Sequence, residues 1–356
     1  MKTKQNLDSV DIAKVFLALM VVAIHTPLLV KISGSRNLLK PWLDLAVPMF
    51  YLISFYLLSL RLRHEGTDEG KSRVRLKYYS RNAKLYFLWF IVLLPATLIV
   101  RRASWFGHGF ERGITAFVNS LFFGSTFQGS YFLSASIIAV AVVSFIQIKF
   151  RAFYLIILAV VFYVFTMLAM DGYFIGHTTG LLPSIYAYVR SAFGDPYYNF
   201  IKAVPYVVIA QYISPPLKMQ LCEGDSVRQR THSLNRSCYK VAFVVVLSIA
   251  YYVEWRCFGH IGMTLAPLCV AILIWIKDMD ISFCCAKYLR SYSIILYLSH
   301  LPFIYTINWF RNREYIKVDN NGVTVFVSAA VFGVLLTILF HHLERHTKLN
   351  WIRFMH

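Results

Sequence analysis

The sequence predicts an all-α membrane protein: a polytopic bundle of about ten transmembrane helices with both the N- and the C-terminus on the cytoplasmic side. Two observations predict this class. First, 58% of the 356 residues are hydrophobic and only 15% are charged, a composition far more apolar than that of a soluble domain. Second, the apolar residues form long uncharged runs, which are typical of helices that cross a bilayer. We expect one integral-membrane domain over residues 1–356, with no separate soluble domain.

Ten segments are long enough, or nearly so, to cross about 30 Å of hydrocarbon at 1.5 Å per residue. Because backbone groups in lipid must bond within their own segment, each run is predicted to be a helix. The first run follows two lysines, as in a signal peptide, but no small-residue cleavage pattern follows it, so we expect it to remain as a span. The ten segments lie near residues 10–30, 41–60, 83–100, 131–148, 152–170, 200–215, 240–254, 261–276, 291–310 and 323–340.

The distribution of Lys and Arg predicts the direction of the spans. With a cytoplasmic N-terminus and ten spans, 24 of the 36 Lys and Arg residues lie on or near the cytoplasmic face and 12 on the other face. Cytoplasmic loops of membrane proteins carry this excess. The net charge of +19 is therefore explained by short loops between spans, and we assign the chain no nucleic-acid role.

The first span carries two ionisable side chains on one face. Lys14 and His25 are eleven residues apart, about three helical turns, so they lie on the same face roughly 16 Å from each other. Ionisable groups inside a span usually point into the protein, where they pair or take part in chemistry. We interpret this face as the lining of a reaction site. The alternative is an interfacial lysine and a hydrogen-bonded core histidine.

A cluster of eight basic residues runs from Arg61 to Lys84, in a segment predicted to be a cytoplasmic loop. The cluster acts as a topology signal, or it lies against the anionic inner leaflet. A more specific interpretation starts from Arg81 and Lys84, which are three residues apart on one face of the next span. Cations at the cytoplasmic mouth of a bundle suit a polyanionic cytosolic ligand, and an acyl-CoA fits.

The segments predicted to face outward are aromatic. Residues 113–124 are apolar but too short to cross the bilayer, so we expect an interfacial or re-entrant helix there. The tyrosines between Gly172 and Asn199 could form a platform for a glycan, although an aromatic belt at the membrane interface explains them more simply. The six cysteines show no disulfide framework and no CxxC pair, and we expect no metal site.

Five motifs occur in an order and spacing that resemble a known family. The first span ends in VVAIHTP, the second reads VPMFYLISFYLL, the third begins within RNAKLYFLWFIVLLP, the fourth begins YFLSASI, and residues 288–302 read YLRSYSIILYLSHLP. Over about residues 10–343 the chain resembles the acyltransferase-3 family of integral-membrane O-acyltransferases. It is most similar to the branch that includes the membrane halves of membrane-bound serine racemases and various Gram-positive envelope acyltransferases.

The resemblance implies a ten-helix bundle that accepts an acyl group, usually acetyl from acetyl-CoA, at the cytoplasmic side. The group passes to a hydroxyl of a cell-envelope glycan or a lipid-linked saccharide, which is a form of polysaccharide modification. Acetyl-CoA, or another acyl-CoA, is then a co-substrate, and no bound cofactor is expected. The implied location is the cytoplasmic (inner) membrane of a bacterium, with the lipid bilayer as the surrounding partner.

The resemblance also implies roles for particular residues. The family pattern of Arg, ten residues and His falls on Lys14 and His25, where Lys keeps the charge but loses the planar fork of Arg. The family's Tyr and His before a proline fall on Tyr297 and His300, and its outer-loop Arg falls loosely on Arg190.

The second span departs from the family pattern. Phe55 stands where the family usually has a glycine that allows close helix contact. The packing around residue 55 is therefore expected to differ, or the activity to be altered.

Acyl transfer to an alcohol needs a base for the hydroxyl proton and a group that stabilises the oxyanion. His25 is predicted to be the base, or a transient covalent carrier of the acyl group. Tyr297 and His300 share one face of the ninth span and are predicted to bind substrate or the oxyanion. The chain has no GxSxG elbow, Gly-rich phosphate loop or HExxH motif.

Two other function classes stay open at this point. A transporter or flippase also uses ionisable groups along a polar path through the membrane. A regulatory membrane domain that kept the fold and lost the reaction is consistent with the glycine-to-Phe55 departure.

Overall fold

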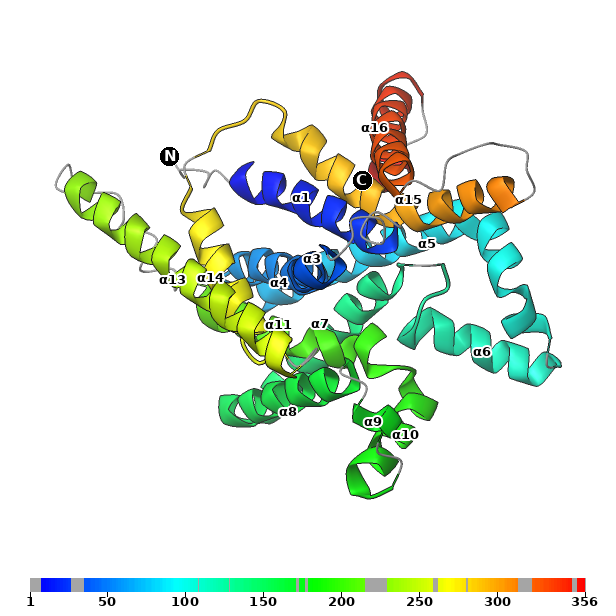
Figure 1. The fold of residues 1–356 in the computed structure, drawn as a ribbon, viewed down its shortest axis with the longest axis horizontal. Coiled ribbons are helices and arrows are strands. Elements are labelled where there is room, and N and C mark those ends of the chain that lie inside the picture. The colour runs from blue at the N-terminus through cyan, green and yellow to red at the C-terminus, as the bar shows by residue number, and fades with distance from the viewer. Residues whose placement is uncertain are drawn as a thin grey trace. The chain divides into compact units, whose positions relative to one another are not determined.

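The computed structural model describes residues 8–26, 35–107, 109–127, 129–170, 173–176, 179–214, 229–258, 262–279, 281–312, 322–347 and 351–355. Within these ranges the regular structure is entirely helical (Figure 1), so the predicted all-α class is confirmed. Each of the ten predicted spans overlaps a helix. Four described stretches are long and apolar enough to cross a membrane: Leu38–His64, Tyr131–Lys149, Ala152–Met170 and Gly322–His346.

The chain divides into two compact units, each built from segments that are far apart in the sequence. The first unit comprises Met1–Val47, Arg81–Leu133 and Asp280–His356, and the second comprises Pro48–Ser80 and Ser134–Met279. The helices α4 (Ala46–His64), α5 (Asp68–Phe106) and α7 (Tyr131–Lys149) each contribute residues to both units.

In the first unit, two helices from opposite ends of the sequence lie side by side. Helix α1 spans Asp8–His25 and helix α15 spans Ala286–Asn312 (Figure 1). They run parallel, because Asp11 contacts Arg290 near the start of each helix and His25 contacts His300 further along. The other elements of this unit are α3 (Ser35–Asp44), α6 (Phe110–Phe123), α16 (Gly322–His346), η2 (Ile352–Phe354) and the part of α5 from Arg81.

Helix α16 packs closely on α15 in the same unit. A Cβ added at Gly333 would lie 3.0 Å from Leu296 Cδ1 and 3.1 Å from Tyr292 Cε2. The Tyr292 hydroxyl donates a hydrogen bond to the Ala330 carbonyl at 3.2 Å. Small residues at such positions let two helix backbones approach each other in a membrane bundle.

The second unit is built around buried aromatic side chains. The rings of Tyr51 and Phe55 stack with centroids 5.8 Å apart, and Tyr51 also stacks on Tyr206 at 6.2 Å. Phe55 is 0% exposed, so the position where the family usually has a glycine is filled by a ring in the core. The further elements of this unit are α8 (Ala152–Met170), α9 (Tyr173–Gly176), α10 (Leu181–Phe193), η1 (Pro196–Tyr198), α11 (Phe200–Ile213), α13 (Gln229–Phe258) and α14 (Leu265–Lys277).

The segment between Arg61 and Lys84 is mostly helical, so the expected loop is wrong, while its cytoplasmic location stays a prediction. Helix α4 continues to His64, and α5 begins again at Asp68 after three residues. Asp68 and Glu69 occupy the first turn of α5, where carboxylates favour helix formation, and Lys71 pairs with Asp68 at 3.1 Å. The basic side chains therefore project from two helix ends. The helix expected over residues 113–124 is present as α6.

Candidate active site

The histidine end of the α1–α15 pair combines two residues that are 275 positions apart in the chain. The ring centroids of His25 and His300 are 5.4 Å apart and tilted by 36°. His25 is the last residue of α1 and is exposed, whereas His300 lies inside α15 and is 1% exposed. One imidazole is thus open to an incoming molecule, and the other supports it from inside the protein.

The hydrogen bonds of His300 determine which of its ring nitrogens carries the proton. Nδ1 lies 2.8 Å from the carbonyl oxygen of Tyr297 and 3.1 Å from that of Leu296. A carbonyl oxygen only accepts, so Nδ1 must donate and Nε2 keeps its lone pair in the neutral ring. Nε2 is buried and has no hydrogen-bond partner among the described residues. A buried acceptor of this kind is available for a proton or a donor that comes with the substrate.

Aromatic side chains form the wall beside the two histidines. The Tyr297 ring lies 6.2 Å from that of His300, and Phe132 meets Tyr297 edge-on at 5.5 Å. Phe132 follows a turn in which Gly129 adopts φ +87°, and a Cβ added at Gly129 would lie 3.9 Å from the Tyr297 carbonyl oxygen. A left-handed backbone at that point favours glycine, so the local sequence positions α7's first turn against α15.

The other end of the α1–α15 pair is a charged cluster around Asp11. The Asp11 carboxylate is 2% exposed and accepts from Arg290 Nε at 3.1 and 3.0 Å and from Nη2 at 2.5 Å. Lys14 Nζ donates to the same carboxylate at 3.2 Å. The Arg81 guanidinium also lies within electrostatic range of Lys14. Two cations thus bind one buried carboxylate, and a third cation, Arg81, lies near Lys14.

Comparison with known proteins assigns this arrangement to a family. The sequence model of the acyltransferase-3 family, described as an acyltransferase domain, matches residues 7–342. The chain belongs to the acyltransferase-3 family. The match covers both ends of the α1–α15 pair, and the protein is an integral-membrane acyltransferase. Searches of the curated proteins and of the solved structures found no match.

The remaining predicted site residues of this acyltransferase lie elsewhere. Lys84 Nζ sits over the Phe354 ring, 4.5 Å from its centroid, where the C-terminal η2 packs on α5. Nearby, Trp89 Nε1 donates to the Met355 carbonyl at 3.1 Å. Arg190 is an exposed residue of α10 and belongs to the second unit. The first unit therefore brings together Lys14 with Arg81, and His25 with Tyr297 and His300.

Two charged residues of the acyltransferase were missed in the sequence. Asp11 and Arg290 form the bidentate pair that joins α1 to α15, yet neither was singled out. Asp11 stands three residues before Lys14 in an apolar helix, a spacing that places both on one face and was a usable signal. Arg290 is part of the motif at residues 288–302, but nothing local shows that its partner is 279 residues away.

Proposed function

We propose that this acyltransferase moves an acyl group, acetyl in the simplest case, from cytosolic acyl-CoA to a hydroxyl of an envelope glycan or a lipid-linked saccharide. The observation that carries the proposal is the His25–His300 pair, in which the buried Nε2 of His300 has no hydrogen-bond partner among the described residues. A pair of imidazoles is suited to proton transfer near neutral pH.

His300 orients His25 in this mechanism. Its Nδ1 is held by two carbonyl groups, and its Nε2 has no partner among the described residues. We propose that the two rings, whose centroids lie 5.4 Å apart, approach during the reaction and that Nε2 then accepts a hydrogen bond from a ring N–H of His25. That bond leaves the second ring nitrogen of His25 with a lone pair directed at the substrate, as in other sites where a fixed acceptor sets the tautomer of a catalytic histidine.

The transfer then runs in one of two ways. In the direct route, His25 takes the proton of the acceptor hydroxyl as its oxygen attacks the thioester carbonyl, the C–S bond breaks, and the proton passes to the leaving thiolate. In the covalent route, a neutral His25 nitrogen attacks the thioester carbonyl, the C–S bond breaks, and the ring proton of His25 passes to the leaving thiolate. The acceptor hydroxyl then attacks the acyl-imidazole, the C–N bond breaks, and the hydroxyl proton returns to the imidazole. Tyr297 lies beside His300 and is the proposed donor to the oxyanion.

The charged end of the helix pair supports an elongated, anionic donor. Lys14 and Arg81 are cations at the opposite end of α1 from His25, roughly 16 Å away along the helix. A ligand that contacts both the Lys14 end and the His25 end of α1 must carry its negative charges far from its reacting atom. An acyl-CoA has this form, with phosphates at one end and the thioester at the other.

The parallel direction of α1 and α15 supports the proposed topology. Two parallel membrane helices need an odd number of crossings between them, and the ten-span scheme places seven spans between the first and the ninth. We therefore propose ten spans with both termini in the cytoplasm, in the inner membrane of a bacterium. Lys14 and Arg81 then face the cytosol, where acyl-CoA is found.

The test compares membranes that contain the wild type, His25→Ala or His342→Ala, each supplied with acetyl-CoA labelled in the acetyl group. His342 is an exposed histidine of α16 and controls for the loss of an imidazole as such. We expect label on envelope carbohydrate to fall by about 10²–10⁴-fold in His25→Ala only. Equal labelling by His25→Ala and the wild type would remove His25 from the reaction, and no labelling by any of the three would oppose the proposed donor and acceptor.

A further inference from the structure

The second unit contains a cavity of about 560 Å³, a volume in the range of about 300–1,000 Å³ typical of small-molecule sites. It lies where α4 ends, α5 and α8 begin, and α7 and α11 end. In the proposed topology all five of these helix ends face the cytoplasm. None of the predicted site residues lines this cavity.

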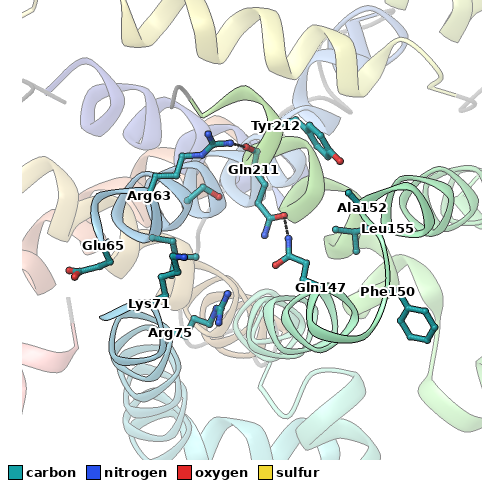
Figure 2. Close-up of a pocket in the computed structure, with 12 residues that line it drawn as sticks. Arg63, Glu65, Lys71, Arg75, Gln147, Phe150, Ala152, Leu155, Gln211 and Tyr212 are labelled. Atoms are coloured by element: carbon teal, nitrogen blue, oxygen red, sulfur yellow. Dashed lines mark hydrogen bonds between the residues drawn. The ribbon is translucent and has the colours of Figure 1, made fainter. Parts of the chain in front are cut away.

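One side of the cavity is cationic. Arg63, Lys71 and Arg75 line it and are accompanied by one carboxylate, Glu65 (Figure 2). Three positive charges against one negative charge leave an excess of two in the lining. An anionic ligand is favoured at a concave cationic wall, where low-dielectric surroundings strengthen the attraction.

The charge on Arg75 is the most available of the three. Lys71 is paired with Asp68 at 3.1 Å, and the Arg63 guanidinium donates to the backbone carbonyl of Gln211. In contrast, Arg75 Nε is buried and has no hydrogen-bond partner among the described residues. Arginine presents a planar fork of N–H donors that matches phosphate oxygens, so the unpartnered Nε of Arg75 favours a phosphate at this wall.

The opposite side of the cavity is apolar. Phe150, Ala152 and Leu155 come from the junction of α7 and α8, on the side of the cavity away from the cations (Figure 2). Between the two sides, Gln147 Nε2 donates to Gln211 Oε1 at 2.5 Å. A ligand that fills the whole space must carry an anionic group at one end and an apolar or aromatic body at the other.

We propose that this cavity binds an amphiphilic phosphate ester, with the phosphate on Arg75 and the apolar body against the α7–α8 junction. Two sources share this chemistry: the nucleotide end of a second CoA molecule, distinct from the donor placed along α1, and the headgroup of an anionic phospholipid. Only the first source rests on the proposed function. The binding itself needs no acyl transfer.

The test measures equilibrium binding to the full-length protein in nanodiscs. Labelled free CoA is titrated onto the wild type, Arg75→Gln and Lys77→Gln, and a spin-labelled phosphatidylglycerol reports lipid contact in a phosphatidylcholine background. Lys77→Gln removes the same charge from α5 at an exposed position outside the cavity lining. Losing one charge-assisted phosphate contact weakens binding by at least about tenfold. We expect this loss for one of the two probes in Arg75→Gln and none in Lys77→Gln.

A second variant guards against a folding artefact. Ala152 is exposed within the cavity wall, so Ala152→Trp fills the space without removing a packed side chain and should also weaken the bound probe. Loss of CoA binding identifies the nucleotide as the source, and loss of phosphatidylglycerol contact identifies the lipid. If neither probe responds to Arg75→Gln or Ala152→Trp, the proposal is overturned. The same titration on His25→Ala separates this result from a failure of acyl transfer.

Discussion

Replacing Asp11 by Asn tests whether the charged cluster stabilises the α1–α15 pair. The two side chains have nearly the same shape, so the change removes the negative charge and little volume. The four hydrogen bonds that Asp11 accepts from Arg290 and Lys14 are all charge-assisted. In Asp11→Asn the two cations remain close together with no carboxylate between them.

The burial of Arg290 and Lys14 determines how much stability the protein loses in Asp11→Asn. Removing one member of a buried ion pair costs about 3–5 kcal/mol, because the other charge stays buried without compensation. Arg290 has 52% of its side chain exposed and can rehydrate, whereas Lys14 has only 16% exposed. We therefore expect the lower end of that range, about 3 kcal/mol. At about 2–4 °C per kcal/mol for a large domain, the apparent Tm should fall by roughly 6–12 °C.

The chain contains a matched control for this change. Asp68 and Lys71 form a pair with the same spacing of three residues and nearly the same length, 3.1 Å against 3.2 Å, but Asp68 is 98% exposed. Exposed ion pairs contribute little to stability, so the Tm of Asp68→Asn should lie within about 1 °C of the wild-type Tm. Thermal unfolding of the purified variants in one detergent measures both shifts in Tm. Equal shifts in Asp11→Asn and Asp68→Asn would refute the argument from burial.

A double-mutant cycle then separates the pair from its surroundings. Arg290→Gln combined with Asp11→Asn removes both charges, so the double variant should lose less stability than the sum of the single variants, by about 1–3 kcal/mol. Strict additivity would mean that the two side chains do not stabilise the protein through each other.

Three further predictions concern packing and chemistry. Gly333→Leu forces a side chain into the α15–α16 contact, where Leu296 is 3.0 Å from the site of a Cβ. The Tm should fall by several degrees, because overpacking costs about 1–3 kcal/mol. The control Gly66→Ala adds a Cβ with nothing within 4 Å and should leave the Tm unchanged. Phe55→Gly restores the residue usual in the family but empties a buried site. We expect the free energy of unfolding, measured by thermal unfolding, to decrease by about 4–6 kcal/mol. A variant more stable than the wild type would contradict the packing of Phe55. His300→Gln should lower the rate of labelled acetyl transfer by about 10²-fold or more, and an unchanged rate in correctly folded protein would exclude His300 from the site.

The helices of this protein are largely predictable from the sequence, because long apolar runs have few other options in lipid. The exception is the segment from Arg61 to Lys84, whose charge predicts a loop although the segment is mostly helical. A helix end tolerates charge well when its first turn is acidic and i,i+3 pairs form along it. Asp68, Glu69 and Lys71 supply these features, so the local sequence did contain the signal.

The site is predictable only where its residues follow helical periodicity. Lys14 and His25 share a face of one helix, and Tyr297 and His300 share a face of another, so each pair can be derived from spacing alone. The contact between the two helices depends on packing across 275 residues, which no local pattern encodes. The cavity around Arg75 is not predictable from a local pattern either, since five helix ends contribute to it.

The Asp11–Arg290 pair also affects how the two histidines meet. Sliding a helix by one residue moves it 1.5 Å along its axis and turns its side chains by about 100°, so His25 faces His300 in only one register of α1 against α15. The bidentate carboxylate–guanidinium contact fixes both the height and the rotation of α1 at its other end, about 21 Å from His25 along the helix. Asp11→Asn should therefore lower kcat for acyl transfer as well as stability, even though Asp11 touches neither imidazole. If transfer stays at the wild-type rate at temperatures where Asp11→Asn is fully folded, the register of α1 is set by its apolar packing alone.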